Sequence, residues 1–217
     1  MKLIILCLGV ALLGSCAISR VAVVSSEQIP KNKDQFVFEN DTVQIAYSFW
    51  AYRGLMSFTV YNKLDKPIFV DWKNSSFISN DQILSYWKDE VNTKTEFRSA
   101  YAPGYYYQTV NHGVSKSQSV KENRVILIPP HSYIANEQYH LINYFDDLPK
   151  ITRTYTPQNT PVRFRNFLSI STNEKFEGEI GYINNIFFVS EVMLVKFQKT
   201  KQAYSQTRFY IGPKKIK

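Results

Sequence analysis

Apolar and polar residues alternate along much of the chain. Val43, Ile45, Tyr47 and Phe49 occupy every second position, with polar or small residues between them. A period of two sends successive side chains to opposite faces of a strand, so this pattern predicts a half-buried β-strand. Similar alternation, or a short apolar run bounded by turn residues, predicts strands at 35–38, 43–49, 55–61, 68–72, 75–78, 124–128, 133–142, 162–171, 186–197 and 204–211.

Three segments depart from this pattern. Residues 80–87 place apolar side chains at helical spacing after Asp81, a residue type that caps helices, and this predicts one short helix. Residues 92–118 and 146–161 are polar and contain prolines, so we expect two long loops there. Many short strands without a strong helical stripe predict an all-β chain folded as a β-sandwich.

The first sixteen residues carry a different pattern. Lys2 precedes an apolar run over 3–13, an order typical of a secretion signal. The run is shorter than the roughly 20 apolar residues that span a bilayer. It ends in Leu13-Gly14-Ser15-Cys16, which resembles the lipobox of bacterial lipoproteins. The alternatives are an ordinary secretory signal with an incidental cysteine and a buried N-terminal strand.

The lipobox resemblance implies cleavage before Cys16 and attachment of lipid to its side chain. Each buried methylene contributes about 0.8 kcal/mol, so the several acyl chains that the family implies would hold the protein firmly. Residues 17–19 include no acidic side chain, and acidic residues there resemble signals for inner-membrane retention or surface export. The resemblance therefore favours the periplasmic face of the outer membrane.

The cysteine count limits the chemistry of the mature chain. The lipobox resemblance implies that Cys7 leaves with the signal segment and that Cys16 carries the lipid. The mature protein then has no disulfide, no cysteine metal site and no cysteine nucleophile, and its stability comes from packing.

These patterns divide the chain into four parts. Residues 1–15 are the expected signal peptide. Residues 16–34 are the expected lipidated tether, because 21–34 is polar and contains Pro30. Residues 35–213 form the expected β-sandwich domain with a C-terminal strand extension, and 214–217 form a basic tail.

The net charge is positive. The 26 Lys and Arg residues exceed the 18 Asp and Glu residues by eight, and removal of Lys2 with the signal leaves an excess of seven. A basic envelope protein suggests anionic neighbours such as lipid headgroups, lipopolysaccharide or cell-wall polymer. Export argues against nucleic acid. The alternative is a charged surface that serves solubility alone.

Two segments of the sandwich carry a second resemblance. Asn62 lies in a turn that leads through Pro67 into the strand at 68–72, and the later strand at 124–128 ends in Pro129-Pro130-His131-Ser132. This arrangement resembles the immunoglobulin-like domains of uncharacterised envelope proteins of the Bacteroides-like phylum. The resemblance implies an immunoglobulin-like sandwich and no activity.

The residues most often used in catalysis form no recognisable set. The histidines at 112, 131 and 140 lack metal-ligand spacing. Ser115 follows Gly113 but lacks the second glycine and the strand–helix context of a nucleophile elbow. The candidate carboxylates, which sequence alone cannot pair, are Asp71, Asp89, Glu90, Asp146 and Asp147. We therefore predict no catalytic residues, no metal and no cofactor, and a periplasmic hydrolase stays an alternative.

One local feature suggests binding. Tyr101, Tyr105, Tyr106 and Tyr107 surround a Pro-Gly turn, and His112 follows. Tyrosine offers a flat apolar face with a hydroxyl group, which suits stacking on sugars or peptides. A binding platform is one interpretation, and packing of these rings back onto the sandwich is the other.

Together these patterns predict a non-enzymatic outer-membrane lipoprotein. Its sandwich would act as a structural or binding module for a protein complex, a glycan or an anionic polymer. A periplasmic hydrolase on a β scaffold is one alternative, and an accessory subunit of a larger envelope machine is another.

Overall fold

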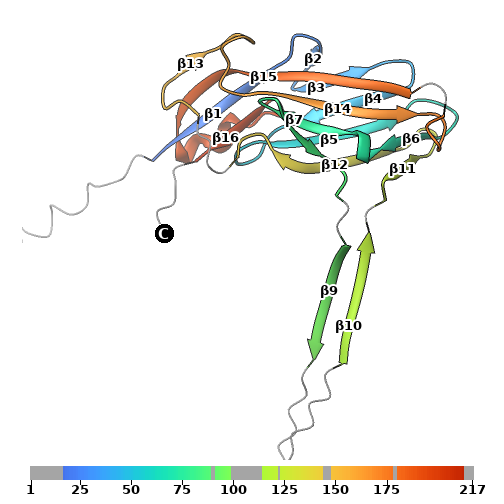
Figure 1. Ribbon diagram of the computed structural model, residues 1–217. Coiled ribbons are helices and arrows are strands. Elements are labelled where there is room, and N and C mark those ends of the chain that lie inside the picture. The colour runs from blue at the N-terminus through green and yellow to red at the C-terminus, as the bar shows by residue number, and fades with distance from the viewer. Residues whose placement is uncertain are drawn as a thin grey trace, which may run out of the picture.

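Two antiparallel β-sheets stacked face to face make up most of the described chain (Figure 1). The computed structural model describes residues 17–88, 91–98, 114–121, 123–143, 148–177 and 180–212. The prediction of an all-β sandwich is confirmed. No helix in this part of the chain is long and apolar enough to cross a membrane.

The larger sheet has nine strands, and its main path runs β11-β6-β14-β15-β1-β16. Two of its strands, β7 and β13, pair with β14 and β15, and β8 extends the sheet from β7. The strands are β1 (Ile18–Ser25), β6 (Ile68–Asp71), β7 (Ser76–Ser79), β8 (Gln82–Ser85), β11 (Val125–Ile128), β13 (Arg153–Thr154), β14 (Arg163–Ser171), β15 (Ile180–Lys196) and β16 (Arg208–Ile211).

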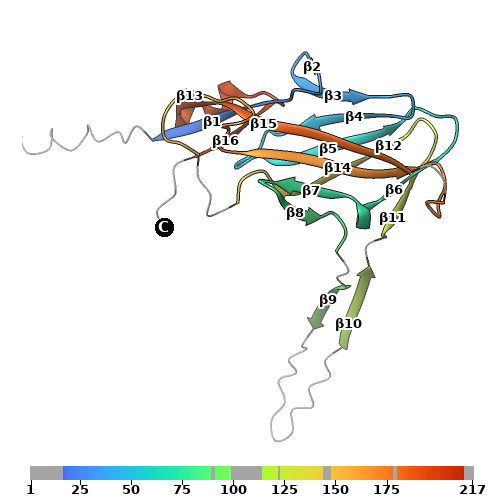
Figure 2. The ribbon, with the colours of Figure 1, turned by 45° about the horizontal axis from the view of Figure 1, so that its top comes forward.

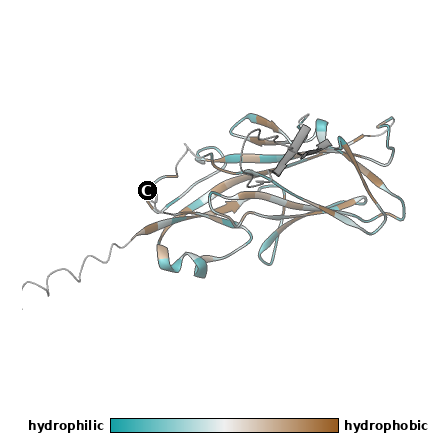
Figure 3. Ribbon diagram, turned by 90° about the horizontal axis from the view of Figure 1, so that it is seen from below, coloured by the Kyte–Doolittle hydropathy of each residue, from teal (hydrophilic) through white to brown (hydrophobic). Residues whose placement is uncertain are grey.

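The smaller sheet has five strands in the order β12-β5-β4-β3-β2. They are β2 (Lys31–Asn32), β3 (Gln35–Glu39), β4 (Val43–Ser48), β5 (Leu55–Asn62) and β12 (Tyr133–His140). Two short 3-10 helices, η1 (Trp72–Asn74) and η2 (Phe197–Ala203), interrupt the strands of the described chain. Figure 3 shows hydrophobic and hydrophilic residues alternating along the strands, as the sequence pattern predicts.

Aromatic rings from both sheets fill the space between them. Phe187 of β15 lies at the centre, with its ring 4.9 Å from that of Tyr47 and 5.4 Å from that of Phe36, both in the smaller sheet. It also contacts Phe164 of its own sheet at 5.5 Å. Edge-to-face and offset contacts of this kind add to the stabilisation from burial, so this cluster joins the two sheets.

The N-terminal strand corrects the predicted domain boundary. Residues 16–34 were expected to form a tether, but β1 lies between β15 and β16 in the larger sheet. Val21 and Ala22 are fully buried, and Val24 is almost so. The polar composition of 25–34 obscures the short apolar run Val21-Ala22-Val23-Val24, and a run of this length is consistent with a buried strand.

The segment 80–87 is not a helix. Asn80 and Asp81 have φ angles of 45° and 66°, and they form the two-residue turn of the hairpin that joins β7 to β8. Two consecutive residues with positive φ are typical of the type I′ turn, which Asn and Asp tolerate better than most residues. The turn preference of this pair thus prevails over the helical spacing that follows it.

The first expected long loop contains paired strands. β9 (Val91–Arg98) and β10 (Val114–Lys121) form an antiparallel ribbon in continuous register. The ribbon extends away from the sandwich (Figures 1 and 2). The prediction of an irregular loop over 92–118 is therefore wrong for these two strands. In the second expected loop, 146–161, the described part contains the short strand β13.

Asn62 connects the two segments on which the immunoglobulin-like resemblance rests. Its side-chain amide donates hydrogen bonds to the carbonyl oxygens of Lys66, Ile128 and Pro129, at 2.8–3.1 Å. Its side-chain oxygen accepts a bond from the amide of Leu64 at 2.9 Å. A fully buried asparagine therefore fixes the turn before β6 to the end of β11.

Candidate binding groove on the outer face of the larger sheet

The alternation along β14 divides its side chains between the core and the outer face. Phe164, Asn166 and Leu168 are buried, whereas Arg163 and Arg165 lie on the opposite face. The period of two in a strand places both arginines on one side, about 7 Å apart along the chain. The strand therefore places Arg163 and Arg165 on its outer face while Phe164 and Leu168 stay in the core.

The β7–β8 turn lies beside these arginines. The amide of Asn80 donates to the carbonyl oxygen of Arg163 at 2.8 Å, and the Asn80 side-chain oxygen accepts from the amide of Arg163 at 3.0 Å. This two-point contact fixes the turn against the start of β14. It also places the carboxylate of Asp81 at the same site.

Turn and strands together enclose a groove with a volume of about 320 Å³. We call it the arginine groove, and its lining residues are Ile78, Asn80, Asp81, Arg163, Phe164, Arg165 and Ile186. Its size lies at the lower end of the range of about 300–1,000 Å³ that is typical of small-molecule sites.

The charges of the groove favour an anionic ligand. Neither Arg163 nor Arg165 makes a side-chain hydrogen bond or ion pair with any other residue that the structure describes. Asp81 offers one negative charge against their two positive charges. Arginine binds carboxylate and phosphate groups through paired N–H donors, so two uncommitted guanidinium groups can hold acidic groups of a ligand.

An aromatic pair continues the same outer face. Phe167, two residues beyond Arg165 on β14, stacks on Tyr182 of β15 with ring centroids 5.5 Å apart and planes 20° apart. Tyr182 is 62% exposed. A flat exposed ring on the same face of the sheet as the two arginines suits a sugar ring that carries acidic substituents.

The site residues predicted from the sequence lie outside the described part of the chain. These are Cys16, Tyr101, Tyr105, Tyr106, Tyr107 and His112. In the sequence this tyrosine-rich segment lies between β9 and β10, whose residues Arg98 and Val114 pair. Both the lipid attachment and the tyrosine platform stay predictions.

The described histidines lie at the surface or bind backbone. The ring of His131 contacts a carboxylate oxygen of Asp65 at 2.8 Å, a pairing that the sequence did not indicate. The Asp65 side chain is 99% exposed and neither residue lines the groove. His140 binds the carbonyl oxygen of Gly54 at 2.9 Å.

Asp71 is the one candidate carboxylate that the described residues include, and it has a structural role. Arg124 donates two hydrogen bonds to it, at 2.8 Å and 3.2 Å, and Asn74 donates another at 2.8 Å. Burial raises the pKa of Asp71, but the hydrogen bonds and charge of Arg124 outweigh burial and hold that pKa below its usual value. The other candidates, Asp89, Glu90, Asp146 and Asp147, lie outside the described residues.

A buried polar network lies in the core. The Tyr86 hydroxyl donates to the side-chain oxygen of Asn166 at 2.8 Å, and Asn166 and Asn185 donate to the Tyr47 hydroxyl at 3.2 Å and 2.7 Å. Burial raises the pKa of both tyrosines. These groups are paired and enclosed, so they stabilise the fold. Within the described ranges, no three His, Cys, Asp or Glu residues cluster as metal ligands would.

The arginine groove was not predicted from the sequence. The alternation Arg163-Phe164-Arg165 does indicate two cations on one face of a strand. The position of the β7–β8 turn beside them depends on long-range pairing between β7 and β14, which no local pattern reveals. No known protein family matches the chain, and neither the curated proteins nor the solved structures include a match.

Proposed function

We propose that this protein is a lipid-anchored lipoprotein of the outer membrane, facing the periplasm, whose sandwich is a non-enzymatic binding module. Its ligand would be an anionic glycan of the envelope, held in the arginine groove. The anchor rests on the sequence Leu13-Gly14-Ser15-Cys16. The observation that carries the ligand class is the pair Arg163 and Arg165, which face one groove without a described partner.

The composition of the groove favours binding over hydrolysis. Glycoside hydrolysis needs two carboxyl groups on opposite sides of the scissile bond, whereas Asp81 is the one carboxylate among the groove's described lining residues. The two arginines can orient acidic groups, and the stacked pair Phe167 and Tyr182 can support a sugar ring farther along the sheet.

The test is titration calorimetry of the mature chain with a soluble uronic-acid polymer and with a neutral polysaccharide. We expect binding of the acidic polymer alone. The double variant Arg163→Gln/Arg165→Gln should weaken it at least tenfold, because each charge-assisted hydrogen bond contributes about 1.5–3 kcal/mol. Asp81→Asn should strengthen it, because the variant removes the opposing charge while Asn still tolerates positive φ.

The matched control is Lys66→Gln/Lys175→Gln, which removes two exposed charges outside the groove. At a salt concentration that screens the weak general effect of net charge, this control should bind with an affinity within twofold of that of the wild type. Equal affinity for the neutral polymer, or equal weakening by the control and the groove variant, would contradict the proposed ligand class.

A second candidate function is that of an accessory subunit in a larger envelope assembly. The observation that favours it is the β9–β10 ribbon, which extends from the sandwich as a protein-contacting arm would (Figure 2). Co-purification from solubilised membranes tests it. Replacement of residues 91–121 by a short flexible linker should abolish capture of the partner and leave the lipid anchor in place. Unchanged capture would exclude the ribbon as the contact.

A further inference from the structure

The start of β1, the end of β15 and the helix η2 meet at one end of the sandwich. Ile18 pairs with Lys196, and the amide of Phe197 donates a hydrogen bond to the carbonyl oxygen of Ala17 at 2.9 Å. β16 ends at the same place, since Ile211 pairs with Arg20 (Figure 1). We call this region the anchor end, defined by Ile18, Leu194, Lys196, Phe197, Lys199, Lys201 and Tyr204.

The anchor end exposes large apolar side chains. Ile18 is 54% exposed, Phe197 48% and Tyr204 57%, and Leu194 is less exposed at 39%. Ile18 begins β1, Leu194 lies near the end of β15, Phe197 begins η2 and Tyr204 directly follows η2. Single exposed apolar residues are common on protein surfaces, but four at the junction of three elements indicate a contact surface.

The basic charge of the protein is concentrated in the same part of the chain. Residues 192–217 contain seven of the 26 Lys and Arg residues and none of the 18 Asp and Glu residues. With Lys2 assigned to the signal segment, the other 18 basic residues balance all 18 acidic ones. The excess charge of the mature chain therefore comes entirely from this segment, in which Lys196, Lys199 and Lys201 are exposed.

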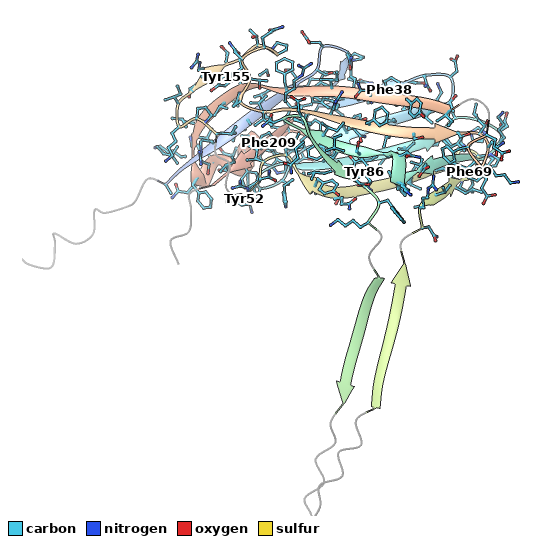
Figure 4. The ribbon with its side chains drawn as sticks, in the orientation of Figure 1. Phe38, Tyr52, Phe69, Tyr86, Tyr155 and Phe209 are labelled. Atoms are coloured by element: carbon cyan, nitrogen blue, oxygen red, sulfur yellow. The ribbon has the colours of Figure 1, made fainter. Side chains whose placement is uncertain are left out.

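Aromatic rings border this surface. Trp50 lies between Tyr204 and Tyr210, with ring centroids 5.3 Å and 5.2 Å away. Tyr210 in turn contacts Tyr52 at 6.0 Å, and Figure 4 shows Tyr52 at this end of the sandwich. Trp and Tyr are enriched at the boundary between headgroups and hydrocarbon, because their rings are apolar at one end and polar at the other.

We propose that the anchor end docks directly on an anionic phospholipid surface. Lys196, Lys199 and Lys201 would contact the headgroups, while Ile18 and Phe197 enter the interface. This inference rests on the proposed lipid attachment at Cys16, because only Ala17 separates that residue from β1 and the anchor end must then face the bilayer. The exposed aliphatic side chains of Ile18 and Leu194 can be buried in the membrane interface but not by a hydrophilic polymer, so they favour lipid over a soluble glycan.

The experiment separates docking from lipidation. The mature chain from residue 16, with Cys16→Ser, carries no lipid and is sedimented with vesicles of phosphatidylcholine alone or of phosphatidylcholine mixed with phosphatidylglycerol. We expect binding to the anionic vesicles and loss of that binding at high salt. Each lysine near an anionic surface changes the partition coefficient about fivefold, so Lys196→Gln/Lys199→Gln/Lys201→Gln should lower it roughly a hundredfold.

A control variant, Lys66→Gln/Lys88→Gln/Lys175→Gln, removes the same charge from exposed sites outside the anchor end and should change partition far less. Phe197→Ser, at the exposed start of η2, should weaken binding without loss of fold by circular dichroism. Equal sedimentation with both vesicle types, or an equal effect of the two lysine variants, would overturn the inference. The mass of the Cys16 peptide from the wild-type chain tests lipidation independently. Failure of the lipid attachment and failure of the docking are therefore distinguishable.

Discussion

The amide of Phe197 donates a hydrogen bond to the carbonyl oxygen of Ala17, the residue that directly follows Cys16. This bond ties the first described residue to the start of η2, and the next residue, Ile18, already belongs to β1. A lipid on Cys16 would therefore hold the sandwich against the membrane at a distance of one residue. A freely swinging domain on a tether of about twenty residues is not compatible with this geometry.

The first prediction concerns β1. Val21 is fully buried between β15 and β16, so Val21→Asp buries an unpaired charge and should lower the free energy of unfolding by about 4 kcal/mol or more. Thermal unfolding followed by circular dichroism measures the effect. The neighbouring control is Ser19→Ala. The Ser19 hydroxyl is buried without a hydrogen-bond partner among the described residues, so its removal should not destabilise the domain. A fully stable Val21→Asp variant would restore the tether interpretation.

The second prediction concerns pH. Arg124 holds the pKa of Asp71 below its usual value despite burial, so the folded state favours the carboxylate. Asp71 then stabilises the fold above pH ~4, the ordinary aspartate pKa, and this contribution is lost as the pH falls through the lower folded-state pKa. Asp71→Asn should cost about 2–3 kcal/mol at neutral pH, and the difference from wild type should narrow in acid.

Denaturant unfolding at several pH values checks the Asp71 prediction. The control is Glu39→Gln, because the hydrogen bond from Lys63 also lowers the pKa of Glu39 but the Glu39 carboxylate is exposed to solvent. Solvent screens such a pair, and the variant should cost much less. A difference between Asp71→Asn and wild type that stays constant from neutral to acid pH would argue against a depressed pKa.

The third prediction concerns Asn62. Asn62→Ala removes four hydrogen bonds and takes this donor from the buried carbonyl of Ile128, so we expect a loss of about 3 kcal/mol. Asn184→Ala, at an exposed position on β15, should stay within about 0.5 kcal/mol of wild type. Equal stabilities for the two variants would remove Asn62 as the connection between the β6 turn and the end of β11.

The fourth prediction concerns the buried network. Tyr86→Phe deletes the hydroxyl that donates to Asn166 and leaves a buried acceptor unpaired, which should cost about 1–3 kcal/mol. Tyr182→Phe makes the same chemical change on an exposed ring and should be nearly neutral. Chemical denaturation of the two variants provides the comparison, and a neutral Tyr86→Phe would indicate that water replaces the lost donor.

The sequence predicts most strands because burial on one face imposes a period of two. The pattern Val43, Ile45 and Tyr47 corresponds directly to the core face of β4. Sequence pattern gives the wrong element where a turn preference competes with helical spacing, as at Asn80 and Asp81, which form a turn. It also fails for β1, whose membership in the sheet depends on partners more than 160 residues away in the chain.

The candidate groove was harder to predict than the fold. Arg163 and Arg165 are visible as outward-facing residues once a strand is assigned, but their site is completed by a turn some eighty residues earlier. The register between β7 and β14 determines whether the β7–β8 turn lies beside Arg163 and Arg165. Register depends on the whole sheet rather than on either strand alone. Candidate sites chosen from local clusters, such as the tyrosine-rich segment 101–107, cannot include such an arrangement.

The central claim is a lipid anchor at the start of a membrane-docked sandwich. Its most direct test is the mass of the N-terminal peptide of the full chain, recovered from the membrane fraction of a bacterium that expresses it. The account predicts a chain that begins at Cys16 and carries a thioether-linked diacylglyceryl group on that residue. A mature chain with an unmodified Cys16, or one that begins at another residue, would contradict it.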